Sequence, residues 1–321
     1  MPARLLAIGV AISLAACGLN QTQPASPTPS TVTPMALSPS PSASQPSASA
    51  VPSASVPPSS PRPSIQPVVP VRSIPSYNNH GSRTRKWIAL TFDADMYPWM
   101  YAERNRVSLV DPRIIELLEK THTPATIFLN GLFAEAFPSL VKRFGGDPTI
   151  ELANHSWDHA GWTADCPNTT PIRAPMTERT EVTWTEAIVS RLTGVEVHFF
   201  RFPGFCRTSR EVALVRSLGE RSIGSDCFFG DTLGWSTQRQ IASVEGGCTR
   251  GSIVVTHLNG PPFHPNVYEA LETLIPWWKA HGWTIVTVGR LLGDPTPRPR
   301  GRADRVCLGF DESASPSLSR C

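Results

Sequence analysis

The sequence predicts an α/β fold, a distorted (β/α) barrel of about seven parallel strands preceded by a disordered Pro/Ser-rich tether. Three observations predict it. Short apolar runs recur between residues 87 and 288, amphipathic helical patterns separate most of them, and no charged residue occurs between Cys17 and Arg62. Strands that alternate with helices form parallel sheets, and about seven repeats favour a barrel.

The start of the chain has the features of an exported lipoprotein. Arg4 precedes an apolar run that ends in Leu14-Ala15-Ala16-Cys17. The run is too short to span a bilayer, so we interpret residues 1–16 as a signal peptide. Its end resembles a bacterial lipobox, which predicts lipid on Cys17. The alternative is an ordinary secretory signal beside an incidental cysteine.

Residues 17–82 are rich in Pro, Ser, Ala and Thr. This composition cannot bury enough apolar surface to offset the entropy of ordering, so we predict a disordered tether. About 60 residues of flexible coil would span roughly 40 Å, the depth of a cell-wall polymer. The same composition is equally compatible with a simple spacer that has no role in reaching a substrate. We expect the folded domain over residues 83–293 and a tail over residues 294–321.

Cysteine usage and charge narrow the class of protein. No CxxC spacing occurs, which argues against a cysteine-ligated zinc. The net charge of +3 is too small to imply nucleic acid, and no basic stripe is interleaved with aromatic residues. An even number of cysteines besides Cys17 favours disulfides in an exported domain, with the pairing left open and the tail interpreted as a disulfide-tied strap. These cysteines are Cys166, Cys206, Cys227, Cys248, Cys307 and Cys321.

The expected elements follow from hydrophobic periodicity. The expected strands lie over residues 87–92, 125–129, 149–153, 195–200, 222–225, 253–256 and 283–288. The expected helices lie over residues 113–120, 132–144, 178–192 and 267–281. Functional groups of parallel α/β folds sit at the carboxyl ends of the strands. The residues that end each apolar run are therefore candidates for a site.

Two histidines stand four residues apart after the third run, in Asn154-His155-Ser156-Trp157-Asp158-His159. Residues i and i+4 lie on one face of a helical turn, so both rings can converge on a divalent cation. Neutral imidazoles suit zinc, cobalt or nickel. Such a pair alone is more often two surface or packed histidines, so the metal hypothesis depends on its neighbours.

Other chemically active side chains end neighbouring runs. Asp93 and Asp95 end the first run, Arg201 the fourth and His257 the sixth. Each has an ordinary explanation by itself, as a helix cap, a surface ion pair or a packed histidine. Their coincidence at the same end of successive strands favours one shared site.

With these residues the sequence resembles the polysaccharide deacetylases, the NodB-homology domain of carbohydrate esterase family 4, over residues 87–292. Thr91-Phe92-Asp93 is similar to the first family motif, whose first aspartate is the catalytic base. The stretch from His155 to His159 is similar to the second motif, whose histidines bind the metal. The family fold is a distorted (β/α) barrel of seven or so strands, in agreement with the repeats above.

The later motifs match to different degrees. Arg201-Phe202-Pro203 matches the third motif, which lines the groove and orients the base. Asp231-Thr232-Leu233-Gly234-Trp235 is similar to a weakened fourth motif. The stretch that ends in Thr256-His257 resembles the fifth, which supplies the catalytic histidine.

The sequence departs from the family at two places. Ala94 stands where the family has a second, metal-binding aspartate, and Asp95 is our candidate third ligand, with water as the alternative. Side chains alternate along a strand, so Asp95 is expected to point the same way as Asp93 and not to replace its neighbour unless the chain turns there. In the fourth motif Gly234 replaces an acidic residue that supports the arginine, and we consider Asp226 or Asp231 as substitutes.

Candidate groove residues complete the site. Residues 96–111 form a longer connection than the family usually has after its first motif, and Tyr97, Trp99 and Tyr101 are either a sugar-stacking wall or a covering loop. We also expect Pro203, Phe205 and Trp235 to line the substrate groove.

The resemblance implies a metal-dependent hydrolase that removes N-acetyl groups from a cell-wall or extracellular polysaccharide such as peptidoglycan or a chitin-like glycan. Asp93 would be the base, His257 the acid and Arg201 the partner of Asp93. The metal, most plausibly zinc with cobalt or nickel as alternatives, would bind His155 and His159. We expect a monomer that binds a polysaccharide and, through Cys17, a membrane.

Other functions remain open at this point. An O-acetyl esterase acting on xylan would pass through the same oxyanion. A catalytically weak carbohydrate-binding lipoprotein would keep the fold with a looser metal site, and a solute-binding lipoprotein would hold no metal. We expect the protein in the cell envelope, on the outer face of the bacterial cytoplasmic membrane or in the periplasm.

Overall fold

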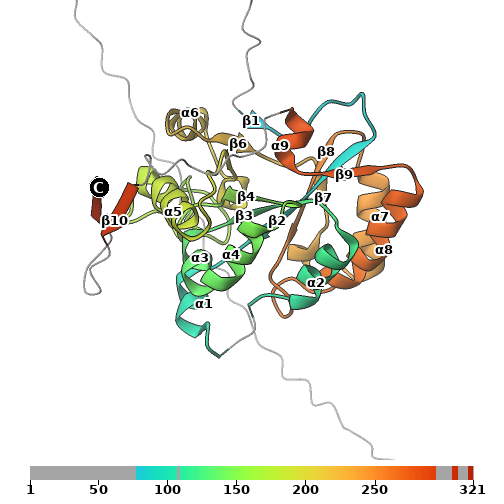
Figure 1. Ribbon diagram of the computed structural model, residues 1–321, viewed down its shortest axis with the longest axis horizontal. Helices are drawn as coiled ribbons and strands as arrows, with labels where there is room; N and C mark the ends of the chain where they lie inside the picture. The colour runs from blue at the N-terminus through green and yellow to red at the C-terminus, as the bar shows by residue number, and fades with distance from the viewer. Residues whose placement is uncertain (1–76, 107–108, 294–305, 310–316, 321) are drawn as a thin grey trace, which may run out of the picture. The chain divides into compact units, whose positions relative to one another are not determined.

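The computed structural model describes residues 77–106, 109–293, 306–309 and 317–320, and Figure 1 shows its elements in chain order. The expected signal peptide, Cys17, most of the tether and Cys321 lie outside the described residues. Within the described part of the chain, no helix is both long and apolar enough to cross a membrane.

Parallel strands form the centre of the domain. The order across the sheet is β1-β6-β5-β4-β3-β2-β8-β7, with β9 beside β2. Every pairing in this sheet is parallel. Among the described residues no pairing joins β7 to β1, so the sheet is an open half-barrel. The strands are β1 (Tyr77–Asn78), β2 (Trp87–Ala94), β3 (Ala125–Leu129), β4 (Ile150–Asn154), β5 (Phe199–Phe200), β6 (Arg221–Ile223), β7 (Cys227–Phe228), β8 (Ser252–His257) and β9 (Thr284–Val286).

The predicted α/β fold with parallel strands is confirmed, with one correction at its start. Residues 77–82 were expected in the tether, but β1 pairs with β6, and Gly224 N donates to Asn78 O at 2.7 Å. Gly224 allows this contact because a side chain there would collide with Tyr77 and Asn79. A separate antiparallel pair, β10 (Val306–Gly309) and β11 (Ser317–Arg320), follows the domain.

Strand β2 is shared by three neighbours. It pairs with β8 along residues 88–93, with β9 along 87–89 and with β3 along 91–94. Because a strand has two edges, β9 and β3 divide one edge between them. Side chains of β2 alternate between two apolar clusters: Leu90, Phe92 and Ala94 belong to the cluster that includes the helices, and Ala89 belongs to the cluster inside the half-barrel.

Apolar side chains from the strands and from α9 fill the inside of the half-barrel. Seven strands contribute one residue each and α9 contributes two. These residues are Ala89, Phe128, Ala153, Phe199, Ile223, Ile253, Val286, Val288 and Leu291. The interior is therefore a packed core, and the predicted catalytic residues lie at its carboxyl end.

Helices cover the outside of the sheet. The four expected helices are present, but the one expected over residues 132–144 is divided, because Pro138 begins a new helix after the non-helical Phe137. In Figure 1, α2, α7 and α8 group beside β8, and α3, α4 and α5 group on the other side. The helices are α1 (Pro98–Glu103), α2 (Pro112–Thr121), α3 (Gly131–Ala136), α4 (Pro138–Gly146), α5 (Glu178–Thr193), α6 (Ser209–Ser217), α7 (Thr237–Gly247), α8 (Val267–Ala280) and α9 (Val288–Leu292), with the short 3₁₀ turns η1 (Pro203–Phe205) and η2 (Asp231–Leu233).

Two disulfides join segments that are distant in the sequence. Cys166–Cys206 joins the loop after β4 to the segment after η1, and Cys227–Cys248 joins β7 to the end of α7. Disulfides in this domain agree with the expectation for an exported protein. Of the last two cysteines, Cys321 lies outside the described residues and Cys307 is described only by its backbone.

Candidate active site

Asp93 and Arg201 form a buried ion pair at the carboxyl end of the sheet. Arg201 Nη1 donates to Asp93 Oδ1 at 2.6 Å, and neither side chain is more than a few per cent exposed. The guanidinium lies 3.9 Å from the Phe128 ring centroid, and Nη2 donates to Gly224 O at 3.3 Å. Arg201 is thus fixed on three sides, and Asp93 Oδ2 remains directed toward His155 Nε2, 3.8 Å away.

Asp95 occupies the position predicted by strand alternation. Ala94 points into the outer apolar cluster, whereas Asp95 returns to the side of Asp93. Its Oδ1 lies 3.4 Å from His155 Nε2, and its Oδ2 lies 3.4 Å from His159 Nε2. The sequence did not indicate Asn259, which fixes the Asp95 backbone by accepting from its N–H and donating to its carbonyl, both at 3.0 Å.

The two histidines converge for a different reason from the one expected. Residues 155–160 form a bent loop and not a helical turn. Ser156 and His159 have φ values of 67° and 64°, and these two left-handed residues fold the loop back on itself. The His155 and His159 ring centroids end 5.0 Å apart. The predicted convergence is right, and the predicted helix is wrong.

The donors of Asp95, His155 and His159 fit a divalent cation. Their ligand atoms lie within 4.8 Å of one another and all three residues are buried. His155 Nδ1 lies 2.8 Å from Arg201 O, so a proton on Nδ1 would leave Nε2 as a lone pair toward Asp95. Asp95 Oδ1 and His159 Nδ1 have no hydrogen-bond partner. A buried carboxylate oxygen without a donor is costly unless a cation satisfies it.

The protonation states in this cluster suit that use. Burial lowers the pKa of His159 to about 4, helped by the nearby His155 and against the pull of Asp95, so this ring is neutral at neutral pH. Burial alone would raise the pKa of Asp95, but His159, His155 and His257 hold it well below its usual value. Burial opposes protonation of His155, while Asp93 and Asp95 raise its pKa, so a cation there would compete with a proton.

His257 is held by one oxygen of Asp231. Its Nδ1 lies 2.8 Å from Asp231 Oδ2, and the same oxygen accepts from the His257 backbone N–H and from Thr256 Oγ1, both at 3.0 Å. Burial would lower the pKa of His257, but Asp231, with smaller effects from Asp95 and Asp93, raises it to about 9. The ring is therefore protonated at neutral pH.

This arrangement corrects the expectation that Asp226 or Asp231 supports Arg201. Asp231 binds His257 instead. Asp226 binds Arg83 at 2.5 Å and accepts from the Ile253 N–H at 2.9 Å, on β8. The residues that fix Arg201 besides Asp93 are the Phe128 ring and a backbone carbonyl.

His264 is a second residue that the sequence did not indicate. Its ring stacks on that of His257, with centroids 3.9 Å apart and planes 4° apart. Burial, together with the positive charge of His257, lowers the pKa of His264 to about 4. The only local signal is its place in Pro261-Pro262-Phe263-His264-Pro265, a rigid connection before α8.

The four expected groove residues take different positions. The Tyr97 ring centroid lies 4.5 Å from that of His159, and Tyr97 lines a cavity of about 520 Å³. The Phe205 ring is half-buried with its centroid 5.7 Å from the Arg201 guanidinium. Pro203 is buried, and Trp235 packs over Gly230 and beneath the Arg239 guanidinium. Neither Pro203 nor Trp235 lines the cavity that includes Tyr97.

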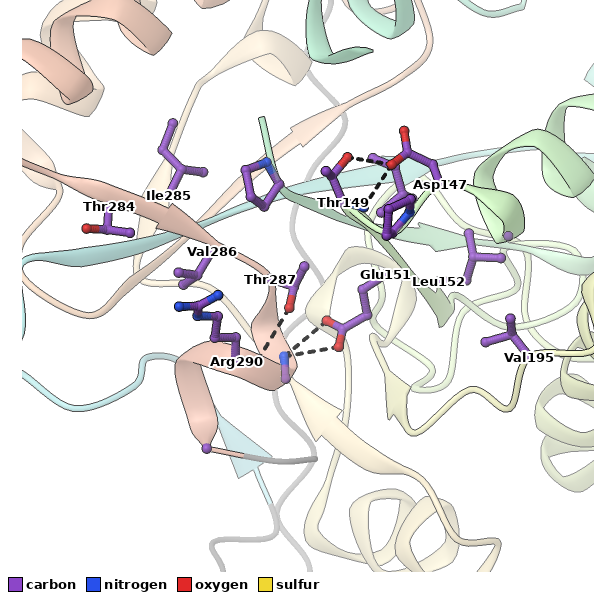
Figure 2. A pocket seen from close by; sticks show the side chains of 16 residues that line it. Asp147, Thr149, Glu151, Leu152, Val195, Thr284, Ile285, Val286, Thr287 and Arg290 are labelled. Atoms are coloured by element: carbon purple, nitrogen blue, oxygen red, sulfur yellow. Dashed lines mark hydrogen bonds between the residues drawn. The ribbon is translucent and has the colours of Figure 1, made fainter. Parts of the chain in front are cut away.

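A larger cavity lies at the opposite end of the sheet. It measures about 780 Å³ and is lined by residues around the starts of β4 and β9. Figure 2 shows Glu151 pointing there toward the first turn of α9, where its carboxylate accepts from Gly289 N. None of the predicted site residues lines this cavity. The catalytic candidates therefore gather at the carboxyl end alone.

Comparison with known proteins agrees with this geometry. Residues 80–223 match the family model described as polysaccharide deacetylase. This part of the chain belongs to the polysaccharide deacetylase family. The matched residues include Asp93, Asp95, His155, His159 and Arg201, whereas His257 lies beyond them.

Curated relatives of the deacetylase domain share about a quarter of its sequence. A peptidoglycan-N-acetylglucosamine deacetylase of Bacillus cereus is 27% identical over 180 residues, which cover 55% of this chain and 61% of that protein. A bifunctional xylanase/deacetylase of Pseudobutyrivibrio xylanivorans is 27% identical over 219 residues, which cover 67% of this chain and 32% of that protein. The chain thus spans less than two thirds of either relative.

Solved structures share the fold. A peptidoglycan N-acetylglucosamine deacetylase aligns with a TM-score of 0.57 and 23% identity over 70% of this chain and 95% of that one. A family 4 pseudoenzyme from Bacillus anthracis gives 0.54 and 21% over 68% and 71%. A family 4 acetyl xylan esterase from Clostridium thermocellum, in complex with a cobalt ion, gives 0.51 and 25% over 65% and 93%.

Proposed function

We propose that this protein is a metal-dependent hydrolase that removes N-acetyl groups from a cell-wall or extracellular polysaccharide. One observation carries the proposal. A carboxylate fixed by an arginine and a protonated imidazole fixed by an aspartate flank a cluster of three buried metal-type donors. Hydrolysis of an N-acetyl group needs a base for the attacking water, an acid for the departing amine and stabilisation of an oxyanion, and each has its own candidate here.

We assign His155, His159 and Asp95 as the residues that would hold the cation. Two imidazoles and a carboxylate suit zinc, and the same set also accepts cobalt or nickel. The acetyl xylan esterase that resembles this domain is bound to cobalt. When bound, such a cation polarises a carbonyl oxygen and lowers the pKa of water.

Asp93 is the proposed base. Its Oδ1 is occupied by Arg201, so Oδ2 is the oxygen that would take a proton from the attacking water. Oδ2 faces the cluster, 3.8 Å from His155 Nε2. The buried guanidinium also keeps the carboxylate in one orientation, which reduces the reorganisation needed during the reaction.

His257 is the proposed acid. A proton on Nδ1 is donated to Asp231, which leaves the Nε2 proton for the departing amine. Nε2 lies 3.7 Å from Asp95 Oδ2, so the acid and the proposed metal ligands face a common point. A group that stays protonated near neutral pH suits an amine, because the amine must leave with a proton.

A second candidate is the removal of O-acetyl groups from a polysaccharide such as xylan. This candidate is supported by the acetyl xylan esterase and the xylanase/deacetylase among the proteins that resemble this chain. An alkoxide and an amine leave the same tetrahedral intermediate, so the described residues serve either reaction. The peptidoglycan deacetylase among the curated relatives supports the cell envelope as the site of action, where lipid on Cys17 would retain a monomeric enzyme.

The test is acetate release from a panel of glycans measured by mass spectrometry. We expect zinc-loaded protein to release acetate from N-acetylated peptidoglycan fragments or chitin oligomers, and a chelator to abolish release. Asp93→Asn should lose about 10³-fold in kcat while it keeps its metal. His155→Ala should lose both.

Each contrary result has a distinct meaning. Full activity of Asp93→Asn would overturn the base assignment. Release from acetylated xylan alone would make the O-acetyl esterase the correct function. No release from any glycan by the loaded protein would leave a binding protein with a deacetylase fold.

A further inference from the structure

The cavity beside the site is built from three separate segments. The segment after β2 contributes Tyr97 to Met100, the segment before α8 contributes Phe263 and His264, and the loop after β4 contributes Asn168 and Thr170. Its volume of about 520 Å³ lies within the range of small-molecule pockets. Apolar rings form two of its sides and polar side chains the third.

Trp99 is unusual for its exposure. Its side chain is 54% exposed, and among the residues that the structure describes it is the only exposed tryptophan. Its ring centroid lies 6.3 Å from that of Tyr97 with planes 21° apart, and 5.6 Å from that of Phe263. An indole that contacts two aromatic neighbours and is more than half exposed offers a flat apolar surface.

The cavity borders the proposed reaction centre through two of the residues that line it, Tyr97 and His264. Tyr97 contacts His159, one of the proposed metal ligands, with ring centroids 4.5 Å apart. His264 stacks on His257, the proposed acid, with centroids 3.9 Å apart. A molecule in the cavity therefore lies one side chain away from a proposed metal ligand and from the proposed acid.

We propose that this cavity is a subsite for a second sugar ring of the polysaccharide, with Trp99 as the surface on which that ring stacks. The inference rests on the proposed function. The C–H face of a pyranose is flat and apolar and matches the open indole, and its rim of hydroxyl groups matches Asn168 and Thr170. The subsite makes affinity depend on the length of the glycan and orients the chain across the reaction centre.

Tyr101 is not part of this surface, although the sequence suggested a wall of three aromatic residues. Its ring centroid lies 4.0 Å from the Arg104 guanidinium, and the side chain packs against the helix-covered core. The wall consists of Tyr97 and Trp99 from the first segment and Phe263 from the second. The second segment could not be recognised from the first motif alone.

The experiment compares β-1,4-linked N-acetylglucosamine oligomers of two and six sugars as substrates of the zinc-loaded protein. We expect the unmodified protein to favour the hexasaccharide. Trp99→Ala should raise KM for the hexasaccharide by about 10-fold, change KM for the disaccharide little and leave kcat unchanged. Trp99→Phe should retain most of the preference, and Trp99→Leu should lose it.

Trp283→Ala is the matched control. Trp283 directly precedes β9, at the amino end of the sheet, where Lys86 lies 5.3 Å from its ring centroid, and its loss should not alter the length preference. Equal hexasaccharide KM values for Trp99→Ala and Trp283→Ala would overturn the subsite. Full rescue by Trp99→Leu would also overturn it, because an apolar cover would then suffice.

Calorimetry separates this inference from the proposed function. The Asp93→Asn protein should bind the hexasaccharide without turnover, and adding Trp99→Ala should weaken binding by about 10-fold. If no protein releases acetate but Trp99→Ala still weakens binding, the function is wrong and the subsite stands. If acetate is released and binding does not change, the subsite is wrong and the function stands.

Discussion

Three hydrogen bonds on a single oxygen of Asp231 determine the state of His257. This aspartate is the first residue of η2 and is fully buried. A buried carboxylate that accepts hydrogen bonds from an imidazole and from the backbone N–H of the same histidine favours the charged form of that imidazole. The sequence placed Asp231 in a weakened motif but did not reveal its partner, because the pairing joins η2 to the end of β8, and these meet only in the fold.

The charge of Asp231 should determine the pH range over which the protein is active. Asp231→Asn removes the negative charge that raises the pKa of His257 to about 9. An acid must be protonated to act, so activity is present below its pKa and lost as the pH rises through it. The alkaline limb of a kcat/KM profile should therefore move to lower pH in Asp231→Asn.

Asp226→Asn is the control for that profile. Asp226 pairs with Arg83 and with the Ile253 N–H near the start of β8, whereas His257 ends this strand. Loss of the Asp226 charge should therefore leave the alkaline limb in place. An unchanged limb in Asp231→Asn would contradict the assignment of His257 as the acid.

Strand-end side chains were predictable from the sequence, and loop-borne partners were not. Asp93, His155, Arg201 and His257 follow apolar runs, and parallel strands bring such ends together. Asn259 and His264 follow no periodic pattern. Their roles come from contacts across sequence separations that a single sequence does not display.

At the scale of elements, α5 supports the loop that carries the two histidines. Glu181 on this helix accepts from the Trp157 N–H at 2.7 Å, and Thr185 donates to Ser156 O at 2.7 Å. These bonds hold residues 155–159 in their bent form without a helix of their own. The spacing of His155 and His159 therefore predicted correctly that the two rings converge, but it did not predict that α5 holds their loop in place.

Glu181 supplies a prediction about stability. Burial, with a further contribution from Asp158, raises the pKa of Glu181 to about 8. The folded protein then keeps a proton that the unfolded chain releases above about pH 4.5, so stability should fall as the pH rises from there to about 8. Glu181→Gln keeps the acceptor for Trp157 and should be more stable than the unmodified protein near pH 8 by about 1–3 kcal/mol.

Urea unfolding across this pH range measures the effect. The two proteins should converge toward acid pH, where Glu181 is protonated in both states. Glu178→Gln, on the same helix and paired with Arg210, should not change the slope. Equal stability of Glu181→Gln and the unmodified protein at every pH would contradict the raised pKa.

Length decided how well the strands were predicted. Strands β2, β3, β4 and β8 are long and strongly apolar and were placed within two residues of their observed bounds. Of the two-residue strands, β5 forms only the end of the run expected over residues 195–200, and β1 and β7 carry too little periodicity to be recognised. Both owe their existence to a neighbouring strand that was already in place.

For the molecule as a whole, the two ends of the half-barrel differ in the residues that they carry. The amino end is closed by α9, whose first turn is bound by Glu151, and its cavity holds none of the catalytic candidates (Figure 2). The carboxyl end gathers every buried charged pair of the proposed mechanism. The disulfide Cys166–Cys206 connects two of the loops that frame this end.

Ala94 shows how the fold places a carboxylate beside the two histidines. A carboxylate at position 94 would point into the apolar cluster beneath the helices, because Ala94 lies on the outer face of β2. One residue further along, Asp95 faces both histidines. The departure from the family motif thus moves the carboxylate by one residue and returns it to the inner face.

The most direct test of this account is the zinc content and affinity of Asp95→Ala, measured by metal analysis and competition with a chelator. We expect one zinc per chain in the unmodified protein and in Asp93→Asn. Asp95→Ala should bind zinc at least about 10-fold more weakly and lose acetate release with it. Zinc bound by Asp95→Ala as tightly as by the unmodified protein would contradict the central claim that Asp95 completes the site of His155 and His159.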